Sequence, residues 1–311
     1  MRRRRSDEAA RRSKIEDADD ARHPPLPEPR EGELVANRWR VGAKLGSGSF
    51  GAVVEVTEQA QDGGKTYAMK METRTRRSQL KYEARCYEQL RGVAGLPRIF
   101  EHGRTPDFTY LVMEHIGEPL DKLQQRHGGT LTLEVACVIG CQAVQRLKDV
   151  HAKGLVHRDI KPGNFTLRNG TVFLCDFGLA KSYVESGGVH APFRDDKRLT
   201  GTPRFASLHT HRGMEQSRRD DLESLIYMLV YLVKGRLPWQ GLKKRDDEQG
   251  GSKDERIAKV KADSEETLCE GMPALQTMYA SVRRLEYEAA PPYQLYCACL
   301  RAPIRDRGEG Q

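Results

Sequence analysis

The chain has 311 residues, of which 38% are hydrophobic and 31% charged, enough for one large domain or two lobes with a sizeable core. The longest apolar run, residues 225–233, falls far short of the roughly 20 residues that span a bilayer, and it predicts a buried helix. The N-terminus carries charges without an apolar segment, so no secretory signal is expected. The composition therefore excludes a membrane-spanning protein and predicts a globular, intracellular one.

Seven cysteines are scattered along the chain, an odd number without paired CxxC spacing near histidines. This pattern favours reduced thiols in an intracellular protein, in the cytoplasm, the nucleus or both. Cys137 and Cys141 lie four residues apart in a predicted helix over 131–151, which would suit a metal pair. Because no histidine or third thiol is placed to complete such a site, core packing is favoured.

The formal net charge of +8 belongs to residues 37–311, since residues 1–36 hold nine basic and nine acidic side chains. A basic body favours acidic or phosphorylated partners. Nucleic acid is disfavoured because no helix-turn-helix, RNP-like or zinc spacing is present. Residues 1–36 have too few apolar side chains to offset the entropy of ordering, which predicts a disordered arm that is basic, acidic and proline-rich in turn.

The folded part is expected to begin near Asn37, and a glycine-rich run follows at residues 45–51, LGSGSFG. A lone GxGxxG is ambiguous because dinucleotide-binding folds also use it, with a helix after the last glycine. Here residues 52–57 are rich in β-branched side chains and alternate like a strand. Strand, glycine loop and strand together predict a flap whose backbone amides lie over phosphates, with Phe50 at its tip.

A third strand is predicted to end at Lys70, and a helix is predicted over residues 78–91. Glu83 on that helix is the best partner for Lys70, and the pair would hold the lysine extended toward phosphate. The alternative is a surface ion pair, which contributes little to stability. The predicted helix over 131–151 is expected to turn five apolar side chains inward: Val135, Val138, Ile139, Val144 and Leu147.

Three acceptor side chains, Asp159, Asn164 and Asp176, lie in one short stretch of the chain. Between the last two, strand-like runs flank Asn169-Gly170, which is typical of a two-residue hairpin turn. A hairpin of this length brings its ends together, which would put one acid near a reacting hydroxyl and two oxygen ligands near a hard cation. Carboxylates that merely cap turns are common for a single Asp-Gly, but not for a pattern this long.

Residues 157–164, HRDIKPGN, followed by DFG at 176–178, form the catalytic signature of protein kinases, and the sequence resembles that superfamily. Most protein kinases have Ala-Pro-Glu after the activation segment, and here that tripeptide is absent. Residues 215–224, EQSRRDDLES, and 237–243, LPWQGLK, are instead similar to the casein kinase 1 family. Gly163 departs from that family, which usually has an acidic residue there, but it is not a metal ligand.

The resemblance implies an α+β, two-lobed protein-kinase fold, with a small β-rich N-lobe that has one main helix and a larger, mostly helical C-lobe. The expected kinase domain covers residues 37–304, with the N-lobe over about 37–114, the hinge over 115–118 and the C-lobe over 119–304. Residues 305–311 are expected to be a polar tail.

The resemblance further implies an ATP-dependent serine/threonine protein kinase that uses Mg²⁺ and acts on acidic or pre-phosphorylated protein substrates. Asp159 would orient the substrate hydroxyl and accept its proton, and Lys161 would contact the γ-phosphate. Asn164 and Asp176 would hold the metal. Asp221, on a buried helix, would anchor the catalytic loop.

ATP-binding positions are implied in the first part of the chain. Met113 is the expected gatekeeper, and backbone groups of Glu114 and Ile116 would bind adenine. The expected ATP-binding residues are Leu45, Gly46, Ser47, Gly48, Ser49, Phe50, Gly51, Val53, Ala68, Lys70, Glu83, Met113, Glu114 and Ile116.

Basic side chains are expected to receive anions from a substrate that is already phosphorylated. Arg158 beside Asp159 is expected to lack a partner unless an anion meets it. One expected group is Arg204, Lys243 and the backbone of Gly235, and the other is Arg158, Lys181 and Lys197. The implied preference is a phosphorylated or acidic residue about three positions before the acceptor. The alternative is that these are ordinary surface charges.

The competing functional hypothesis is a catalytically inactive, kinase-like scaffold. Its usual marker is loss of the metal-binding Asp, the loop Asp or the strand lysine, and Asp176, Asp159 and Lys70 are all present. A small-molecule kinase is disfavoured because the long segment 182–207 is what a protein substrate would rest on.

Overall fold

The structure, a computed structural model, describes residues 29–48, 51–59, 64–73, 78–242 and 252–305. The chain divides into two compact units. Unit 1 comprises Met1–Ala84 and Arg98–His115, and unit 2 comprises Arg85–Pro97 and Ile116–Gln311.

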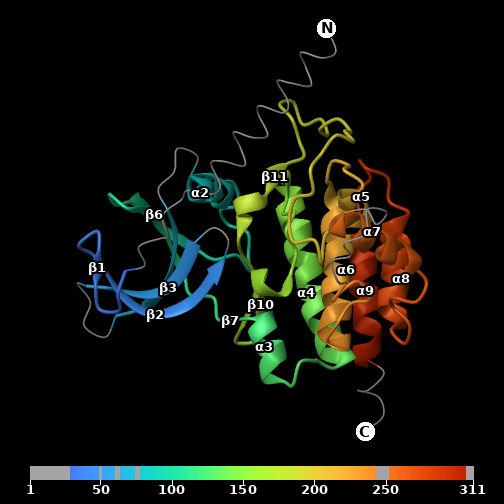
Figure 1. Ribbon diagram of the computed structural model, residues 1–311, viewed down its shortest axis with the longest axis horizontal. Coiled ribbons are helices and arrows are strands. Elements are labelled where there is room, and N and C mark those ends of the chain that lie inside the picture. Colours follow the sequence, from blue (N-terminus) through green and yellow to red (C-terminus); the bar gives the residue numbers. More distant parts are fainter. Residues whose placement is uncertain (1–28, 49–50, 60–63, 74–77, 243–251, 306–311) are drawn as a thin grey trace. The chain divides into compact units, whose positions relative to one another are not determined.

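Unit 1 is built on a six-stranded antiparallel sheet with the strand order β1-β2-β3-β4-β6-β5 (Figure 1). The strands are β1 Leu34–Val35, β2 Trp39–Gly48, β3 Gly51–Glu58, β4 Thr66–Thr73, β5 Ile99–Arg104 and β6 Phe108–Glu114. The strand predicted from alternation at residues 52–57 is confirmed, and the strand expected to end at Lys70 is present and continues to Thr73. The sheet begins at β1, before the expected start at Asn37, because Val35 is buried in the core of the unit.

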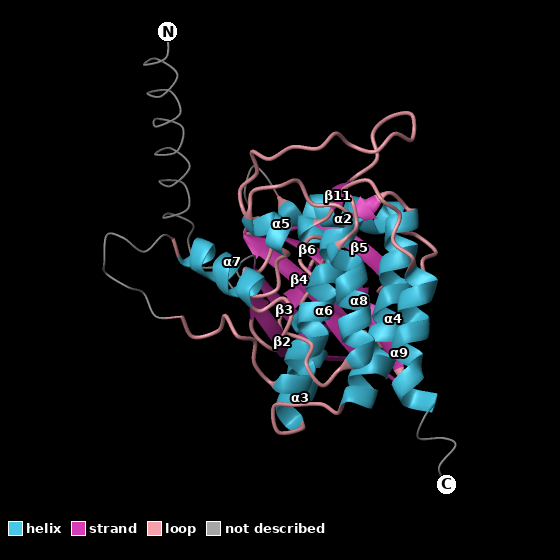
Figure 2. Cartoon of the chain, turned by 90° about the vertical axis from the view of Figure 1, so that its right-hand side faces the viewer, coloured by secondary structure: helices cyan, strands magenta, loops and turns pink. Residues whose placement is uncertain are grey.

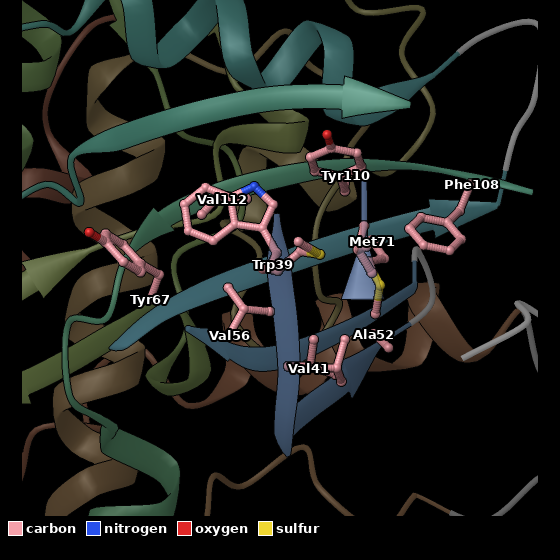
Figure 3. Close-up of a cluster of buried hydrophobic side chains, with 12 residues drawn as sticks. Trp39, Val41, Ala52, Val56, Tyr67, Met71, Phe108, Tyr110 and Val112 are labelled. Atoms are coloured by element: carbon pink, nitrogen blue, oxygen red, sulfur yellow. The ribbon is translucent and has the colours of Figure 1, made fainter. Parts of the chain in front are cut away.

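One face of this sheet carries the core of unit 1 (Figure 3). Trp39 is 1% exposed and its ring meets that of Tyr67 edge to face, with 5.2 Å between the ring centroids. Alternate residues of β3 are buried, as expected for a strand that faces the core on one side. Glu101 satisfies the polar atoms of this core, accepting hydrogen bonds from Trp39 Nε1 at 3.0 Å and the Tyr110 hydroxyl at 2.6 Å.

Helix α2 Gln79–Gln89 begins in unit 1. The Glu72 carboxylate accepts the backbone N–H groups of Gln79 at 2.9 Å and Leu80 at 2.7 Å, which are orphan donors at the first turn of the helix. Leu80 is buried, so this side of the helix faces the protein interior. This start fixes where Glu83, one turn further on, lies.

Unit 2 is mainly helical. Figure 2 shows α4, α6, α8 and α9 lying side by side, and these four pack on one another in pairs. The helices are α3 Leu120–Arg126, α4 Leu133–Ala152, α5 Leu208–His211, α6 Arg218–Lys234, α7 Lys253–Asp263, α8 Pro273–Arg283 and α9 Tyr293–Arg305. Residues Leu225–Leu232 of α6 are almost wholly buried apart from Tyr231, which confirms the buried helix predicted from the apolar run. None of the described helices has the length and apolar character needed to cross a membrane.

Helix α4 corrects one prediction about the core. Ile139, Val144 and Leu147 are buried as expected, but Val135 and Val138 are 44% and 43% exposed, so their predicted inward orientation is wrong. At 3.6 residues per turn these two valines lie on the side of the helix opposite its buried stripe. Hydrophobicity alone does not distinguish the two faces of such a helix.

Short strands of unit 2 position the polar side chains described below. The segments are β7 Glu118–Pro119, β8 Leu155–Val156, β9 Phe165–Arg168, β10 Thr171–Leu174 and β11 Lys181–Ser182, with the 3₁₀ turns η1 Pro162–Asn164 and η2 Phe177–Leu179. Strands β9 and β10 pair antiparallel around Asn169-Gly170, whose φ angles are 51° and 74°. Positive φ at both positions is the geometry of a type I′ turn, so the predicted two-residue hairpin is confirmed.

Candidate active site

The Asp159 carboxylate is held by donors at both of its oxygens. The backbone N–H and the hydroxyl of Thr202 each donate to Oδ1 at 2.8 Å. Lys161 Nζ donates to Oδ2 at 2.6 Å, and Asn164 Nδ2 lies 3.4 Å from the same atom. Asp159 is only 7% exposed, so these bonds compensate for the desolvation of the charge and give the carboxylate one orientation.

Asp221 on α6 is hydrogen-bonded to the backbone just before Asp159. It accepts the backbone N–H groups of His157 at 2.7 Å and Arg158 at 2.8 Å, and His151 Nε2 lies 2.9 Å from Oδ2. Burial by itself would raise the pKa of Asp221, but the hydrogen bond and charge of His151, with those of His157, outweigh it and hold the pKa below its usual value. The predicted anchor is confirmed.

Strands β9 and β10 form a hairpin, and Asn164 and Asp176 lie at its open end, away from the Asn169-Gly170 turn. Asn164 Nδ2 donates to the carbonyl oxygen of Asp159 at 2.8 Å, and the Asn164 carbonyl accepts the N–H of Cys175 at 2.9 Å. Asp176 has a φ of 67°, a left-handed conformation that costs energy for a residue with a side chain. The Tyr87 hydroxyl bonds the Asp176 N–H at 3.1 Å and stabilises this conformation.

In unit 1, Lys70 Nζ lies 2.8 Å from Glu83 Oε2, so the predicted pairing of these residues is confirmed. The Glu83 side chain is 1% exposed and that of Lys70 is 15% exposed, which excludes the surface ion pair considered from the sequence. On the sheet, Lys70 is paired with Val53, and Ala68 is paired with Met113, which is 7% exposed. These residues therefore share neighbouring positions on three adjacent strands.

The glycine-rich run forms the end of the β2–β3 hairpin. Gly46 pairs with Val53, Ser47 with Ala52, and Gly48 with Gly51. Gly51 has a φ of +145°, and a Cβ there would lie 1.7 Å from the carbonyl oxygen of Met71, so no side chain can be accommodated. Ser49 and Phe50, expected at the tip, lie outside the described residues.

Glu114 and Ile116 already use one backbone group each. The Glu114 N–H donates to the carbonyl of Arg98 at 2.7 Å within unit 1. The Ile116 carbonyl accepts the Thr166 hydroxyl at 2.7 Å within unit 2.

The arrangement of an oriented acid, a lysine two residues later and an asparagine five residues later agrees with comparison to known proteins. A family model described as the protein kinase domain matches residues 39–302. The chain belongs to the protein kinase family. The match confirms the two-lobed α+β fold expected for it, and a kinase domain implies ATP, a divalent metal ion and protein substrates.

The residues of this kinase domain fit such a metal. Among the described residues, no group of three or more His, Cys, Asp or Glu could hold an ion by itself. Asn164 and Asp176 would supply oxygen ligands, and phosphate oxygens and water would complete the shell, as is usual for Mg²⁺ in phosphate-transfer sites. The donor set therefore suits a metal that arrives with a nucleotide.

The second basic group expected in the kinase domain has internal partners. Arg158 Nε donates to the carbonyl of Leu179 at 2.8 Å, so the expectation that Arg158 lacks a partner is wrong. Glu215 Oε2 lies 2.8 Å from Lys181 Nζ and 3.5 Å from Lys197 Nζ. Burial would raise the pKa of Glu215, but Lys181 and then Lys197 outweigh it and hold the pKa below its usual value.

Arg204, from the first basic group, lines a cavity of about 720 Å³ together with Lys161 and Thr202. The structure does not bring Gly235 to this cavity: Gly235 ends α6, and its N–H donates to the carbonyl of Tyr231 at 2.8 Å. Lys243 lies outside the described residues.

Gly241 and Lys253 are among the other residues of the kinase domain that line this cavity, and sequence reasoning missed both. Lys253 is the first residue of α7, where a cation opposes the helix dipole. That misplaced charge is the one signal in the sequence that could have drawn attention to it.

Proposed function

We propose that this chain is an active serine/threonine protein kinase of the casein kinase 1 type, which uses ATP and Mg²⁺. The observation that carries the proposal is the environment of Asp159, whose two oxygens are held by Lys161 and Thr202 at 2.6 and 2.8 Å. An acid fixed in this way can orient a hydroxyl and accept its proton.

In the proposed mechanism, Asp159 receives the proton of the substrate Ser or Thr hydroxyl. Lys161 is assigned to the γ-phosphate, where its charge opposes the repulsion between the phosphate and Asp159. Asn164 and Asp176 would hold Mg²⁺, which neutralises phosphate charge when bound. Thr202 keeps the carboxylate in one orientation throughout, so little reorganisation accompanies proton transfer.

The nucleotide is assigned to the residues expected from the sequence. Lys70, held by Glu83, would bind the α- and β-phosphates, and the β2–β3 glycine hairpin would cover them with backbone N–H groups. Backbone groups of Glu114 and Ile116 are the proposed contacts of adenine. Apolar contacts are proposed for Leu45, Val53, Ala68 and the gatekeeper Met113.

The casein kinase 1 assignment is supported by what residues 215–224 do where Ala-Pro-Glu is missing. Ser207 donates to Asp220 Oδ1 at 2.6 Å, and the Leu208 N–H donates to Glu223 Oε1 at 2.7 Å. Glu223 also lies 2.9 Å from Arg283 Nη1. Acids of α6 thus fasten the end of the activation segment, so the absent glutamate is not needed for this purpose.

We further propose that the cavity beside Lys161 receives an anion of the substrate. Arg204 stacks over Phe205 and Tyr231, with its guanidinium 5.8 and 5.6 Å from the ring centroids. In the part of the chain that the structure describes, neither Arg204 nor Lys253 has a side-chain ion pair. Asp121 and Asp254 also line the cavity, but neither forms an ion pair with these two cations, which leaves both cations to meet a phosphate dianion. Arg204 and Lys253, with Lys243 nearby in sequence, are the proposed anion-binding residues.

The function is tested by incubating the purified chain with radiolabelled ATP, Mg²⁺ and casein, followed by phosphoamino-acid analysis. We expect label on serine and threonine and none on tyrosine. Two peptides that differ only in a phosphoserine or serine three positions before the acceptor then test substrate choice. Equal kcat/KM for the two peptides would contradict the anion assignment, and unlabelled casein and peptides would contradict the kinase assignment.

An Arg204→Ala, Lys253→Ala double variant is expected to lose about 10- to 100-fold in kcat/KM on the phosphorylated peptide, because the charge-assisted hydrogen bonds of these two exposed side chains together contribute about 1.5–3 kcal/mol. The loss on the unphosphorylated peptide should be at most about threefold. Arg284→Ala, Lys259→Ala is the matched control, since both residues are exposed and neither lines the cavity. A similar loss of kcat/KM on both peptides would show that Arg204 and Lys253 do not recognise the phosphate of the phosphoserine.

Replacing Glu83 by glutamine should raise the KM for ATP about 10-fold or more, because Lys70 would lose a buried charged partner worth about 1.5–3 kcal/mol. KM for the peptide should stay the same. The measurement is initial-rate kinetics with ATP varied, and Glu88→Gln on the exposed end of α2 is the control. An unchanged KM for ATP would show that the Lys70–Glu83 pair does not contribute to nucleotide binding.

A further inference from the structure

Lys261 is a fully buried cation beneath the segment that follows Thr202. It lies on α7 and is 1% exposed. Its Nζ donates to the carbonyl oxygen of Pro203 at 2.9 Å and to that of Ala206 at 2.5 Å. One side chain therefore joins both ends of the segment Pro203–Ala206.

Two aromatic rings beside Lys261 also help to hold the segment Pro203–Ala206. Nζ lies 4.8 Å from the ring centroid of Tyr227 and 5.0 Å from that of Trp239, close enough for cation–π attraction. Trp239 in turn donates its indole N–H to the carbonyl of Arg204 at 2.7 Å. Three of the four carbonyls in Pro203–Ala206 are thus held from the protein interior.

Packing alone does not require a lysine amine at position 261. Within the described residues, Lys261 has no ion pair, so the groups in direct contact with its charge are carbonyl oxygens and aromatic faces. A methionine would occupy similar volume without the desolvation of a cation. It would, however, leave the Ala206 carbonyl without this donor and the Pro203 carbonyl with His211 Nε2 at 3.1 Å, so the segment would lose two of the hydrogen bonds that define its path.

The segment in question faces the proposed substrate. Thr202 bonds Asp159, and residues 202–205 form one wall of the cavity of about 720 Å³ that also holds Lys161. A polypeptide presenting a hydroxyl to Asp159 would run along this wall. The shape of the wall is therefore part of substrate binding.

We infer that Lys261 is a positioning residue for the protein substrate: by holding the Pro203 and Ala206 carbonyls it shapes the wall on which an extended peptide lies. The inference rests on the proposed function, protein phosphorylation. Lys261 touches neither the nucleotide nor the reacting atoms as assigned above. Its loss should therefore weaken peptide binding and leave ATP use unchanged.

Burial lowers the pKa of Lys261 to about 7, an effect only partly offset by the charges of Glu223 and Asp254. Of the other groups around it, His211 has a pKa lowered by burial to about 4, and the pKa of Tyr227 is raised well above its usual value by burial. Burial would raise the pKa of Glu223, but Arg283 outweighs it and keeps this acid charged. Lys261 is thus the group that loses its charge between pH 6 and about 8.5, which weakens its hydrogen bonds to the carbonyls.

The test compares Lys261→Met with the native chain and with Lys259→Met, an exposed lysine on the same helix. Hydrogen exchange is measured at the N–H groups of Phe205 and Ala206, which bond the Thr202 carbonyl at 2.9 and 3.0 Å. We expect exchange about tenfold faster or more in Lys261→Met only. In kinetics, KM for an acidic, unphosphorylated peptide should rise about tenfold, with kcat and KM for ATP within about twofold.

The pH profile separates positioning from general stability. KM of the native chain for that peptide should rise about threefold from pH 6 to 8.5 as Lys261 loses its proton, and this rise should be absent in Lys261→Met. If Lys261→Met does not fold, Lys261→Gln, which keeps a donor without the charge, is measured in the same way. It should show an intermediate KM and no such rise.

The outcomes distinguish the inference from the proposed function. Unchanged exchange at Phe205 and Ala206 overturns the positioning role, whether or not the chain has kinase activity. Faster exchange with unchanged peptide KM overturns the link to substrate. If the native chain transfers no phosphate, the proposed function fails, and peptide affinity measured by fluorescence anisotropy replaces KM in the same comparison.

Discussion

Replacing Asp159 by asparagine should lower kcat about 10²- to 10⁴-fold, the range that a positioned general base contributes. Asparagine retains an oxygen for the two Thr202 donors, so the loop should keep its shape. Its amide would face Lys161 Nζ in place of an oxygen that now lies 2.6 Å away. The variant therefore lacks both the proton acceptor and the ion pair, while the nucleotide residues are untouched.

The measurement is initial-rate kinetics on the phosphorylated peptide, together with the dissociation constant for ATP with Mg²⁺. ATP affinity should stay within about twofold, since Asp159 has no assigned contact with the nucleotide. Asp107→Asn, an exposed acid in unit 1, is the control for the substitution itself. If Asp159→Asn retains a tenth or more of the native kcat, Asp159 is not the base. If the native chain binds ATP but never transfers label, the scaffold hypothesis is favoured.

Asp221→Asn should lower the free energy of unfolding by about 3–5 kcal/mol, the usual effect of breaking a buried charged network. Oδ2 accepts from His157 N–H and faces His151, and Oδ1 accepts from Arg158 N–H. Whichever way an asparagine amide turns, its NH₂ group meets at least one backbone N–H, so a buried donor loses its acceptor. Urea unfolding at pH 7 measures the change.

The same variant should also lower kcat at temperatures where it is fully folded, by about tenfold, because the loop that presents Asp159 loses its anchor. Asp220→Asn is the matched control: this neighbouring acid is equally buried, but it bonds Ser207 and Ser217 and not the catalytic loop. Asp220→Asn should reduce stability and leave kcat within about twofold. Equal kcat for Asp221→Asn and the native chain would mean that the loop holds its shape without Asp221.

The effect of Asp221 on stability should depend on pH with a definite sign. Its pKa is lower in the folded chain than in the unfolded one, so its contribution is present above the unfolded value of about 3.9 and is lost as pH falls through the folded value. The difference in unfolding free energy between the native chain and Asp221→Asn should therefore narrow below about pH 4. A difference that stays constant down to pH 2 would argue against a charged Asp221.

Local patterns predicted a large part of this molecule. Asn169-Gly170 predicted the hairpin that brings Asn164 toward Asp176, because a two-residue turn with positive φ leaves the flanking strands few alternatives. The strand expected to end at Lys70 and the helix expected around Glu83 likewise predicted a pairing that the structure contains at 2.8 Å. In each case the partners lie within about one supersecondary motif of each other, so spacing in sequence largely determines spacing in space.

Periodicity was insufficient where the answer depends on what packs against an element. Val135 and Val138 carry the same side chain as the buried Val144, yet only the positions of neighbouring helices decide which face of α4 is covered. The basic residues show the same limit. Arg158 and Lys181 were expected to bind an external anion. In the folded chain Arg158 instead donates to the Leu179 carbonyl, and Lys181 pairs with Glu215.

The sequence by itself determined the family, the catalytic loop and the short hairpin, since these are encoded in contiguous residues whose backbone preferences act locally. Tertiary structure alone decided which cations share a cavity and which one is buried. Lys253 lines the same cavity as Arg204, and Lys261 donates to the Pro203 carbonyl, across about 50 or more residues of chain. Contacts at such separations arise from the packing of whole helices, and no motif in the intervening sequence records them.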